Sequence, residues 1–203
     1  VTWFAVGEDP PVSVDVDVDD SVVPDTDTGT DTDAAGATGE DSTDPETSTP
    51  TPEPEPEPTL DIADAATQLR ERINELRQEE RDMDPLTQSS CAAQKAQAHA
   101  ESMATNGYFS HTGRDGTTQT ERYAPCGGGG ENAAKTYVNT EIVTANGDTR
   151  TIETTADLVD SLMTQWMTSR EHREKGIFGD WSAAGGGIAR DGTEIYAVTG
   201  FIL

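Results

Sequence analysis

The stretch Cys126-Gly127-Gly128-Gly129-Gly130-Glu131-Asn132 places four consecutive glycines directly before a carboxylate and an amide. Glycine inside a helix or strand costs conformational entropy, so this run predicts a loop in which the backbone turns tightly or approaches another group closely. The chain has three histidines, and two of them, His111 and His172, lie in short motifs on either side of this stretch. We expect the rest of the folded chain to bring these two side chains to Glu131.

Two helices are predicted before the glycine run. Apolar residues recur at helical spacing between Leu60 and Leu76, which predicts a helix over residues 61–81 that ends before a proline. A second helix, over residues 89–106, is rich in alanine and is followed by Gly107, where a helix-terminating glycine is expected. Its small side chains suit close packing against a sheet or helix. We interpret its histidine, His99, as a partly buried packing residue.

The second half of the domain predicts strands around one more helix. Asn146-Gly147 lies between two β-prone runs, which is the pattern of a hairpin turn. A capping box over residues 154–157 opens a helix that runs to about Glu171. Two strands are expected at the end of the chain, over residues 184–190 and 194–203. This order of elements predicts an α+β domain in packed layers.

Charge and proline divide the 203 residues into two parts. The chain has a net charge of −26, and residues 1–59 contain 17 acidic residues without Lys or Arg. Residues 60–203 contain the other 22 acidic and all 13 basic residues, for a net charge of −9. Nine of the eleven prolines fall within residues 8–59, mixed with Asp, Thr, Ser and Glu. We therefore predict a disordered acidic tether over residues 1–59, with possible O-glycosylation, and one folded domain over residues 60–203.

The composition also constrains partners and location. Strong negative charge disfavours nucleic acid and anionic lipid as partners. An acidic domain poor in Lys resembles proteins of extreme halophiles, in which salt screens the repulsion between carboxylates; an ordinary acidic secreted protein is the alternative. No apolar run approaches the roughly 20 residues of a membrane-spanning helix. The apolar residues 1–7 are interpreted as the end of a removed or truncated anchor or signal sequence, or as a frayed terminus.

Cys91 and Cys126 are the two cysteines of the chain. In an extracellular protein an even number of cysteines predicts a disulfide. A pair of metal ligands is the weaker interpretation, because the CxxC spacing of many metal sites is absent from the sequence. Two buried free thiols are the remaining alternative.

Five motifs in order, from about Leu69 to Leu203, resemble the CAP domain, also called the SCP domain. They are Ile73-Asn74-Glu75-Leu76-Arg77, Phe109-Ser110-His111, Gly130-Glu131-Asn132, residues 166–173 and Gly187-Ile188-Ala189 with Tyr196 and Phe201. The superfamily includes cysteine-rich secretory proteins, insect venom antigen 5 and plant pathogenesis-related proteins. The form Trp-x-x-Ser-x-x-His-Arg is similar to the prokaryotic branch. The resemblance implies a three-layer α-β-α sandwich in which His111, Glu131 and His172 line one open cleft.

The chain departs from the family in and near this cleft. In animal and plant members a second Glu, three residues after the Trp, completes a His/Glu tetrad; here Ser169 occupies that position. The nearby Glu171 would project about 200° around a helix from Ser169 and so does not replace it. In prokaryotic relatives an Asn-Ile-Leu-like run usually follows His-Arg, whereas residues 174–178 read Glu-Lys-Gly-Ile-Phe.

The three site residues allow more than one chemistry. Two imidazoles and a carboxylate can bind a divalent ion such as zinc and leave a position open, or they can act as acid and base. Alternatively, His111 and His172 hydrogen-bond structural loops, and Glu131 anchors loop amides. A helix ending near His172 favours the protonated imidazole, which opposes metal binding, so the affinity should weaken on acidification. Because the second Glu is missing, fewer ligands remain and we expect a weak metal site. The sequence lacks a Gly-x-Ser-x-Gly elbow and a His-Glu-x-x-His pattern.

Two functions therefore remain open. The first, which we favour, is an extracellular or cell-surface-tethered binding module whose cleft takes a small molecule, a lipid, a metal or a protein partner. The second is an extracellular hydrolase, metal-assisted or not, that acts on peptide or cell-envelope material. We expect a monomer and no cofactor other than a divalent metal such as zinc.

Overall fold

A computed structural model describes residues 59–144 and 147–203. The predicted tether and Asn146 of the predicted hairpin lie outside the described residues, apart from Thr59. The centre of the domain is a four-stranded sheet with the strand order β1-β5-β6-β2, in which β1 pairs parallel to β5 and the other neighbours are antiparallel. Its strands are β1 (Thr87–Gln88), β2 (Gly129–Tyr137), β5 (Ala183–Asp191) and β6 (Glu194–Ile202).

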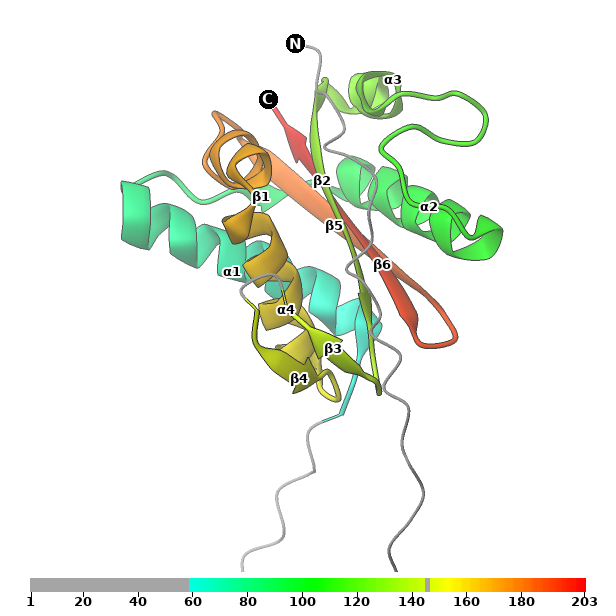
Figure 1. Cartoon of the computed structure of the whole chain (residues 1–203). Helices are drawn as coiled ribbons and strands as arrows, with labels where there is room; N and C mark the ends of the chain where they lie inside the picture. Colours follow the sequence, from blue (N-terminus) through cyan, green and yellow to red (C-terminus); the bar gives the residue numbers. More distant parts are fainter. Residues whose placement is uncertain (1–58, 145–146) are drawn as a thin grey trace, which may run out of the picture. The chain divides into compact units, whose positions relative to one another are not determined.

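Helices cover both faces of this sheet. Helices α1 (Ile62–Arg81) and α4 (Thr155–Thr168) pack on one face, and α2 (Ser90–Asn106) packs on the other (Figure 1). The three-layer α-β-α sandwich predicted from the sequence is confirmed, and α1, α2, β5 and β6 lie within a few residues of their expected bounds.

The alternation of side chains along β6 explains why the sheet has two apolar faces. Ile195, Ala197 and Phe201 are buried in the cluster shared with α1 and α4. Tyr196 and Val198, which point to the opposite face, are buried in the cluster shared with α2. Because successive side chains of a strand alternate between faces, a strand with buried apolar residues on both faces requires a helical layer on each side.

Helix α2 lies unusually close to the sheet, and glycines in β5 make this possible. A Cβ atom at Gly185 would lie 2.3 Å from the amide nitrogen of Ala93, and one at Gly187 would lie 2.2 Å from that of Gln97. Helix α2 begins at the cap Ser89, whose hydroxyl accepts from an amide of the first turn. The alanines of α2 and the glycines of β5 therefore fit the same close approach, as the composition of the helix predicts.

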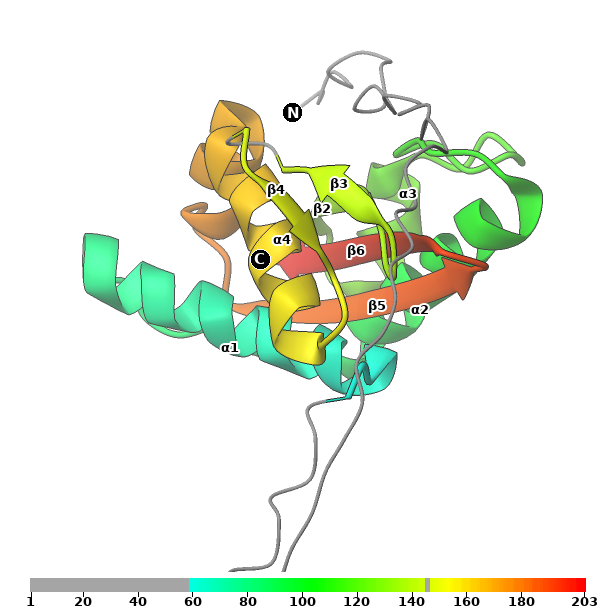
Figure 2. The same cartoon turned by 60° about the horizontal axis from the view of Figure 1, so that its bottom comes forward.

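Shorter elements complete the domain. Helix α3 (Gln119–Tyr123) and a 3-10 turn (Ala124–Cys126) precede β2, and a π-helical turn (His172–Ile177) follows α4. The hairpin β3 (Glu141–Val143) and β4 (Thr149–Thr151) lies beside α4 (Figure 2), with Ile152 buried in the cluster that α4 shares with the sheet. Within residues 59–144 and 147–203, every helix is too short or too polar to cross a bilayer.

The loop prediction for the glycine run is half wrong. Gly127 and Gly128 turn the chain at φ values of +105° and +85°, which favour glycine, but Gly129 and Gly130 are the first residues of β2. A Cβ atom at Gly129 would lie 1.9 Å from the carbonyl oxygen of Phe201, and one at Gly130 would lie 3.0 Å from the ring of Trp181. These two strand positions therefore need glycine because of close contacts.

The predicted disulfide between Cys91 and Cys126 is present, with the two Cα atoms 5.6 Å apart. It joins the first turn of α2 to the end of the 3-10 turn, immediately before the glycine run. Closing a loop of 35 residues stabilises the fold by about 4 kcal/mol in the chain-entropy account. The bond therefore holds the start of β2 against α2.

Candidate functional site

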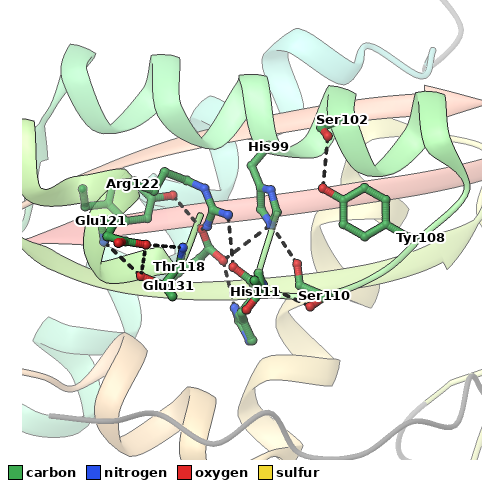
Figure 3. A network of polar contacts seen from close by, with 11 residues as sticks. His99, Ser102, Tyr108, Ser110, His111, Thr118, Glu121, Arg122 and Glu131 are labelled. Carbon is green, nitrogen blue, oxygen red and sulfur yellow. Dashed lines mark hydrogen bonds and ion pairs between the residues drawn. The ribbon is translucent and has the colours of Figure 1, made fainter. Parts of the chain in front are cut away.

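Glu131 lies at the centre of a buried polar network on the α2 side of the sheet. Its side chain has no exposed surface, although it comes from the third residue of β2. His111 Nδ1 donates to Oε1 over 2.8 Å, Arg122 Nη1 donates to Oε2 over 2.7 Å, and the Tyr123 hydroxyl donates to Oε2 over 3.0 Å. Figure 3 shows Arg122 and His111 converging on Glu131 from two sides. Both carboxylate oxygens are therefore engaged.

These contacts keep the carboxylate ionised. Burial alone would raise the pKa of Glu131, but the hydrogen bond from His111 and the charge of Arg122 outweigh it and hold the pKa below its ordinary value. Burial, together with the Glu131 carboxylate, raises the pKa of Tyr123, so its hydroxyl stays a donor. A buried charge of this kind is tolerated because it is paired and hydrogen-bonded.

The network also determines how His111 is oriented. A carboxylate oxygen accepts, so Nδ1 of His111 carries the hydrogen, and in the neutral imidazole Nε2 then carries the free lone pair. Arg122 Nη2 donates to the His111 carbonyl oxygen over 3.0 Å. His99, which is 4% exposed, donates from Nε2 to the Ser110 carbonyl oxygen over 2.8 Å. His99 is thus buried, and it also holds the segment that carries His111.

His172 faces His111 from the π-helical turn after α4. The two ring centroids are 6.3 Å apart. Asn132, the neighbour of Glu131 in β2, donates from Nδ2 to the His172 carbonyl oxygen over 3.2 Å. The buried Arg77 of α1 donates to the carbonyl oxygens of Ile177 and Gly179 over 2.8 and 2.9 Å, which ties the end of the turn to the first helix. The backbone of His172 and the turn that follows it are therefore anchored.

The expectation that a helix end favours protonated His172 is wrong. Helix α4 ends at Thr168, with Ser169 as its C-cap, so His172 does not lie in the last turn of that helix. The pKa of His172 is lowered to about 4, and burial is the largest cause. The nearby His111 also lowers the pKa, and Glu171 raises it by a smaller amount. His172 is therefore a neutral imidazole at neutral pH.

The four predicted cleft residues thus differ in their positions. His111, whose side chain is 28% exposed, and His172 face each other. Glu131 lies beneath His111 and is not open to solvent, because Arg122 and Tyr123 hold it inside. Ser169 is half-buried at the end of α4. Among the residues that the structure describes, no three His, Cys, Asp or Glu side chains are grouped so that they could hold a metal ion.

Sequence reasoning missed Arg122 and Tyr123, the two partners of Oε2. Both lie in the five-residue helix α3, which is too short to show apolar periodicity. The capping box of Thr118 and Glu121 was the available signal for this helix: the Thr118 hydroxyl accepts from the Glu121 amide, and the Glu121 side chain accepts from the Thr118 amide.

Two of the solved structures with a similar fold are bacterial surface or extracellular proteins. An extracellular protein containing an SCP domain from Bacillus anthracis aligns over 70% of this chain with 19% identity and a TM-score of 0.51. The chain spans only 41% of that protein. An outer surface protein from Borrelia burgdorferi aligns over 70% of this chain and 96% of its own length, also with 19% identity and a TM-score of 0.51. At this identity the likeness concerns the fold.

No curated protein of known annotation matches the sequence. The sequence model of the CAP family, described as the cysteine-rich secretory protein family, matches residues 70–202. This range contains both cysteines, the Glu131 network and the facing histidines. The chain therefore belongs to the CAP family of cysteine-rich secretory proteins.

Proposed function

We propose that this chain is an extracellular binding module whose contact residues are the facing side chains of His111 and His172. The fold neighbours described as an extracellular protein and an outer surface protein support a location outside the cell. The disulfide between Cys91 and Cys126 supports the same location, because disulfides persist in oxidising compartments.

The observation that carries this proposal is that both carboxylate oxygens of Glu131 already accept hydrogen bonds within the protein. A carboxylate that serves as a general base must be able to accept a proton from water or substrate in the site. Both oxygens of Glu131 already accept from His111, Arg122 and Tyr123, and its side chain is fully buried. Glu131 is therefore suited to orienting His111, and a two-histidine site without a free carboxylate favours binding over hydrolysis.

A divalent cation such as zinc is the ligand that we propose for this pair. His111 presents Nε2 as its free nitrogen and His172 is neutral, which are the forms that a metal requires. Glu131 would stand behind His111 as the acceptor that fixes the ring, an arrangement common around zinc-bound histidines. His111 and His172 are the two ligands, and within residues 59–144 and 147–203 no third His, Cys, Asp or Glu side chain is placed to join them, so the affinity should be weak. A bound zinc would supply Lewis acidity at the cleft.

Hydrolysis remains the second candidate, and one observation favours it. The buried Glu131 holds His111 in a single tautomer, which is also how a carboxylate prepares a histidine that takes a proton from water. In this reading His111 Nε2 is the base and its lone pair is not available to zinc; in a metal-assisted form, zinc held by His111 and His172 would instead polarise the water. The substrate is peptide or cell-envelope material.

Calorimetric titration with zinc near neutral pH, alongside hydrolysis assays on a peptide library and on cell-envelope material, tests the proposal. We expect measurable zinc binding, weaker by about tenfold or more in His111→Ala and His172→Ala, and no hydrolysis. Glu75→Gln is the control: Glu75 pairs with Arg72 on the exposed surface of α1 and should not affect binding. Unchanged zinc binding in both histidine variants would refute the metal site. Hydrolysis that is lost in His111→Ala would favour the second candidate.

We further propose that residues 1–59 act as a disordered acidic tether that keeps the domain away from a cell surface. The support is compositional, since 17 acidic residues without a basic one and repeated prolines favour an extended, self-repelling chain. The same charge, continued in the folded domain, supports adaptation to high salt.

A further inference from the structure

A pocket lies beside the Glu131 network, and neither His111 nor His172 lines it. It has a volume of about 490 Å³ and lies between α2, the segment from Tyr108 to Thr117 and α3. His99 and Arg122 form the wall that it shares with the network (Figure 3). The volume falls within the range of small-molecule sites.

Two cations line this pocket without a carboxylate partner. Eight of the 13 basic residues make ion pairs with carboxylates in the part of the chain that the structure describes. Lys95 and Arg114 make none there, although the domain is acidic. Lys95 lies one helical turn before His99, so both belong to the face of α2 that lines the pocket. Arg114 donates only to the Asn106 carbonyl oxygen, over 3.4 Å.

Two carboxylates line the same pocket and do not neutralise these cations. Asp115 accepts through Oδ1 from the Thr117 amide over 2.9 Å. Glu121 accepts through Oε2 from the amide and the hydroxyl of Thr118. Asp115 also interacts with the Thr117 side chain, whereas the second oxygen of Glu121 has no partner among the described residues. Besides Arg122, which pairs with Glu131, the pocket therefore presents two charges of each sign, and local hydrogen bonds hold the two carboxylates.

Polar groups form much of the remaining wall. Ser102 and Tyr108 share a hydrogen bond of 3.0 Å between their hydroxyls, and Thr117 adds a third hydroxyl. A hydroxyl can donate one hydrogen bond and accept two, so these side chains retain capacity for a ligand. Such a lining suits a small polar molecule and not an apolar chain.

We propose that this pocket binds a small zwitterion of the size of an amino acid or dipeptide. Lys95 and Arg114 receive its carboxylate, and Asp115 and Glu121 receive its ammonium group. Charge-assisted hydrogen bonds of this kind are the strong ones, and complementary charges of both signs select against molecules that have one sign only. The proposal concerns residues other than His111 and His172 and is independent of what they bind.

Calorimetry with L-alanyl-L-alanine tests the proposal, at a salt concentration at which circular dichroism shows the native fold. The two comparison ligands are the N-acetylated dipeptide, which lacks the ammonium group, and the C-terminal amide, which lacks the carboxylate. We expect the free dipeptide to bind at least about tenfold more tightly than either blocked form. The double variant Lys95→Gln, Arg114→Gln should lose the preference over the amide, and Glu121→Gln should reduce the preference over the acetylated form.

A charge-matched control is Arg72→Gln with Arg190→Gln, which removes two exposed cations elsewhere and should keep the wild-type affinity. His172→Ala should also keep it, because His172 does not line this pocket. Absence of binding, equal binding of the three ligands, or wild-type binding in the Lys95, Arg114 double variant would each overturn the proposal. So would loss of binding in His172→Ala, which would place the ligand between the histidines.

Discussion

Nδ1 of His111 lies 2.8 Å from Oε1 of Glu131, and the carboxylate that receives this hydrogen bond is completely buried. The imidazole is partly exposed while its acceptor is not. Glu131 is therefore a support for His111, and the chemistry available to a ligand is that of the two facing imidazoles.

Replacing Glu131 by Gln should strongly destabilise the domain. The substitution preserves the shape but leaves the buried Arg122 without a counter-charge. Removing one partner of a buried ion pair typically costs about 3–5 kcal/mol. Urea unfolding monitored by circular dichroism measures the change in the free energy of unfolding.

The matched control is Glu194→Gln. Glu194 also pairs with a cation from β2, because Lys135 Nζ lies 2.7 Å from Oε1, but its side chain is 31% exposed. Exposed pairs contribute about 0–1 kcal/mol, so this variant should remain close to wild type. Equal, small losses in both variants would show that Glu131 is not the buried anchor described above.

Acidification should destabilise the domain through His172. The pKa of His172 is about 4 in the folded protein and near its ordinary value of 6.5 in the unfolded chain. Between these values the unfolded chain binds the proton and the folded one does not, so stability falls as the pH drops from about 6.5 to about 4, by roughly 3 kcal/mol. Urea unfolding at several pH values measures this loss.

His172→Gln should remove that part of the pH dependence. Burial also lowers the pKa of His99, so a residual loss of stability in the same direction should persist in the variant. An identical pH profile in the wild type and His172→Gln would contradict the lowered pKa of His172.

Folding should depend on salt. The net charge of the chain is −26, and at low ionic strength the repulsion between carboxylates is screened only beyond about 30 Å at 0.01 M salt. We predict that circular dichroism during desalting shows unfolding. A melting temperature that stays constant from dilute buffer to molar salt would remove the argument for a halophilic protein.

Limited proteolysis should release a stable fragment that begins near Thr59. The described residues begin there, and Thr59 is held to the domain: its carbonyl oxygen accepts from the amide and the hydroxyl of Thr155, which opens α4. Mass spectrometry of the digest identifies the first residue of the fragment. Survival of the full chain at protease concentrations that cut other disordered chains would contradict a disordered tether.

Local chemistry made several elements predictable from the sequence. Helix α2 begins after Ser89 and ends before Gly107, whose φ is +60°, because a capping hydroxyl and a left-handed glycine act within a few residues of the helix ends. The disulfide was predictable from the even number of cysteines. These features depend on residue type and short spacing.

Features that depend on tertiary contacts were not predictable. Gly129 and Gly130 resemble a loop in the sequence, and only the approach of the Phe201 carbonyl and the Trp181 ring explains them as strand residues. The burial of Glu131 could not be predicted from the sequence either, because its partners Arg122 and Tyr123 come from a helix without apolar periodicity. The lowered pKa of His172 likewise follows from burial beside His111.

Glu131 orients His111 so that Nε2 of His111 is free beside His172. The most direct test of this orientation is ¹⁵N NMR of the three histidines during a zinc titration. We predict that neutral His111 carries its hydrogen on Nδ1, and that zinc shifts the Nε2 resonance of His111 and a ring-nitrogen resonance of His172. The buried His99, whose Nε2 donates to the Ser110 carbonyl oxygen, is the internal control and should not respond. Neutral His111 protonated on Nε2, or zinc that leaves both facing histidines unchanged, would contradict the account.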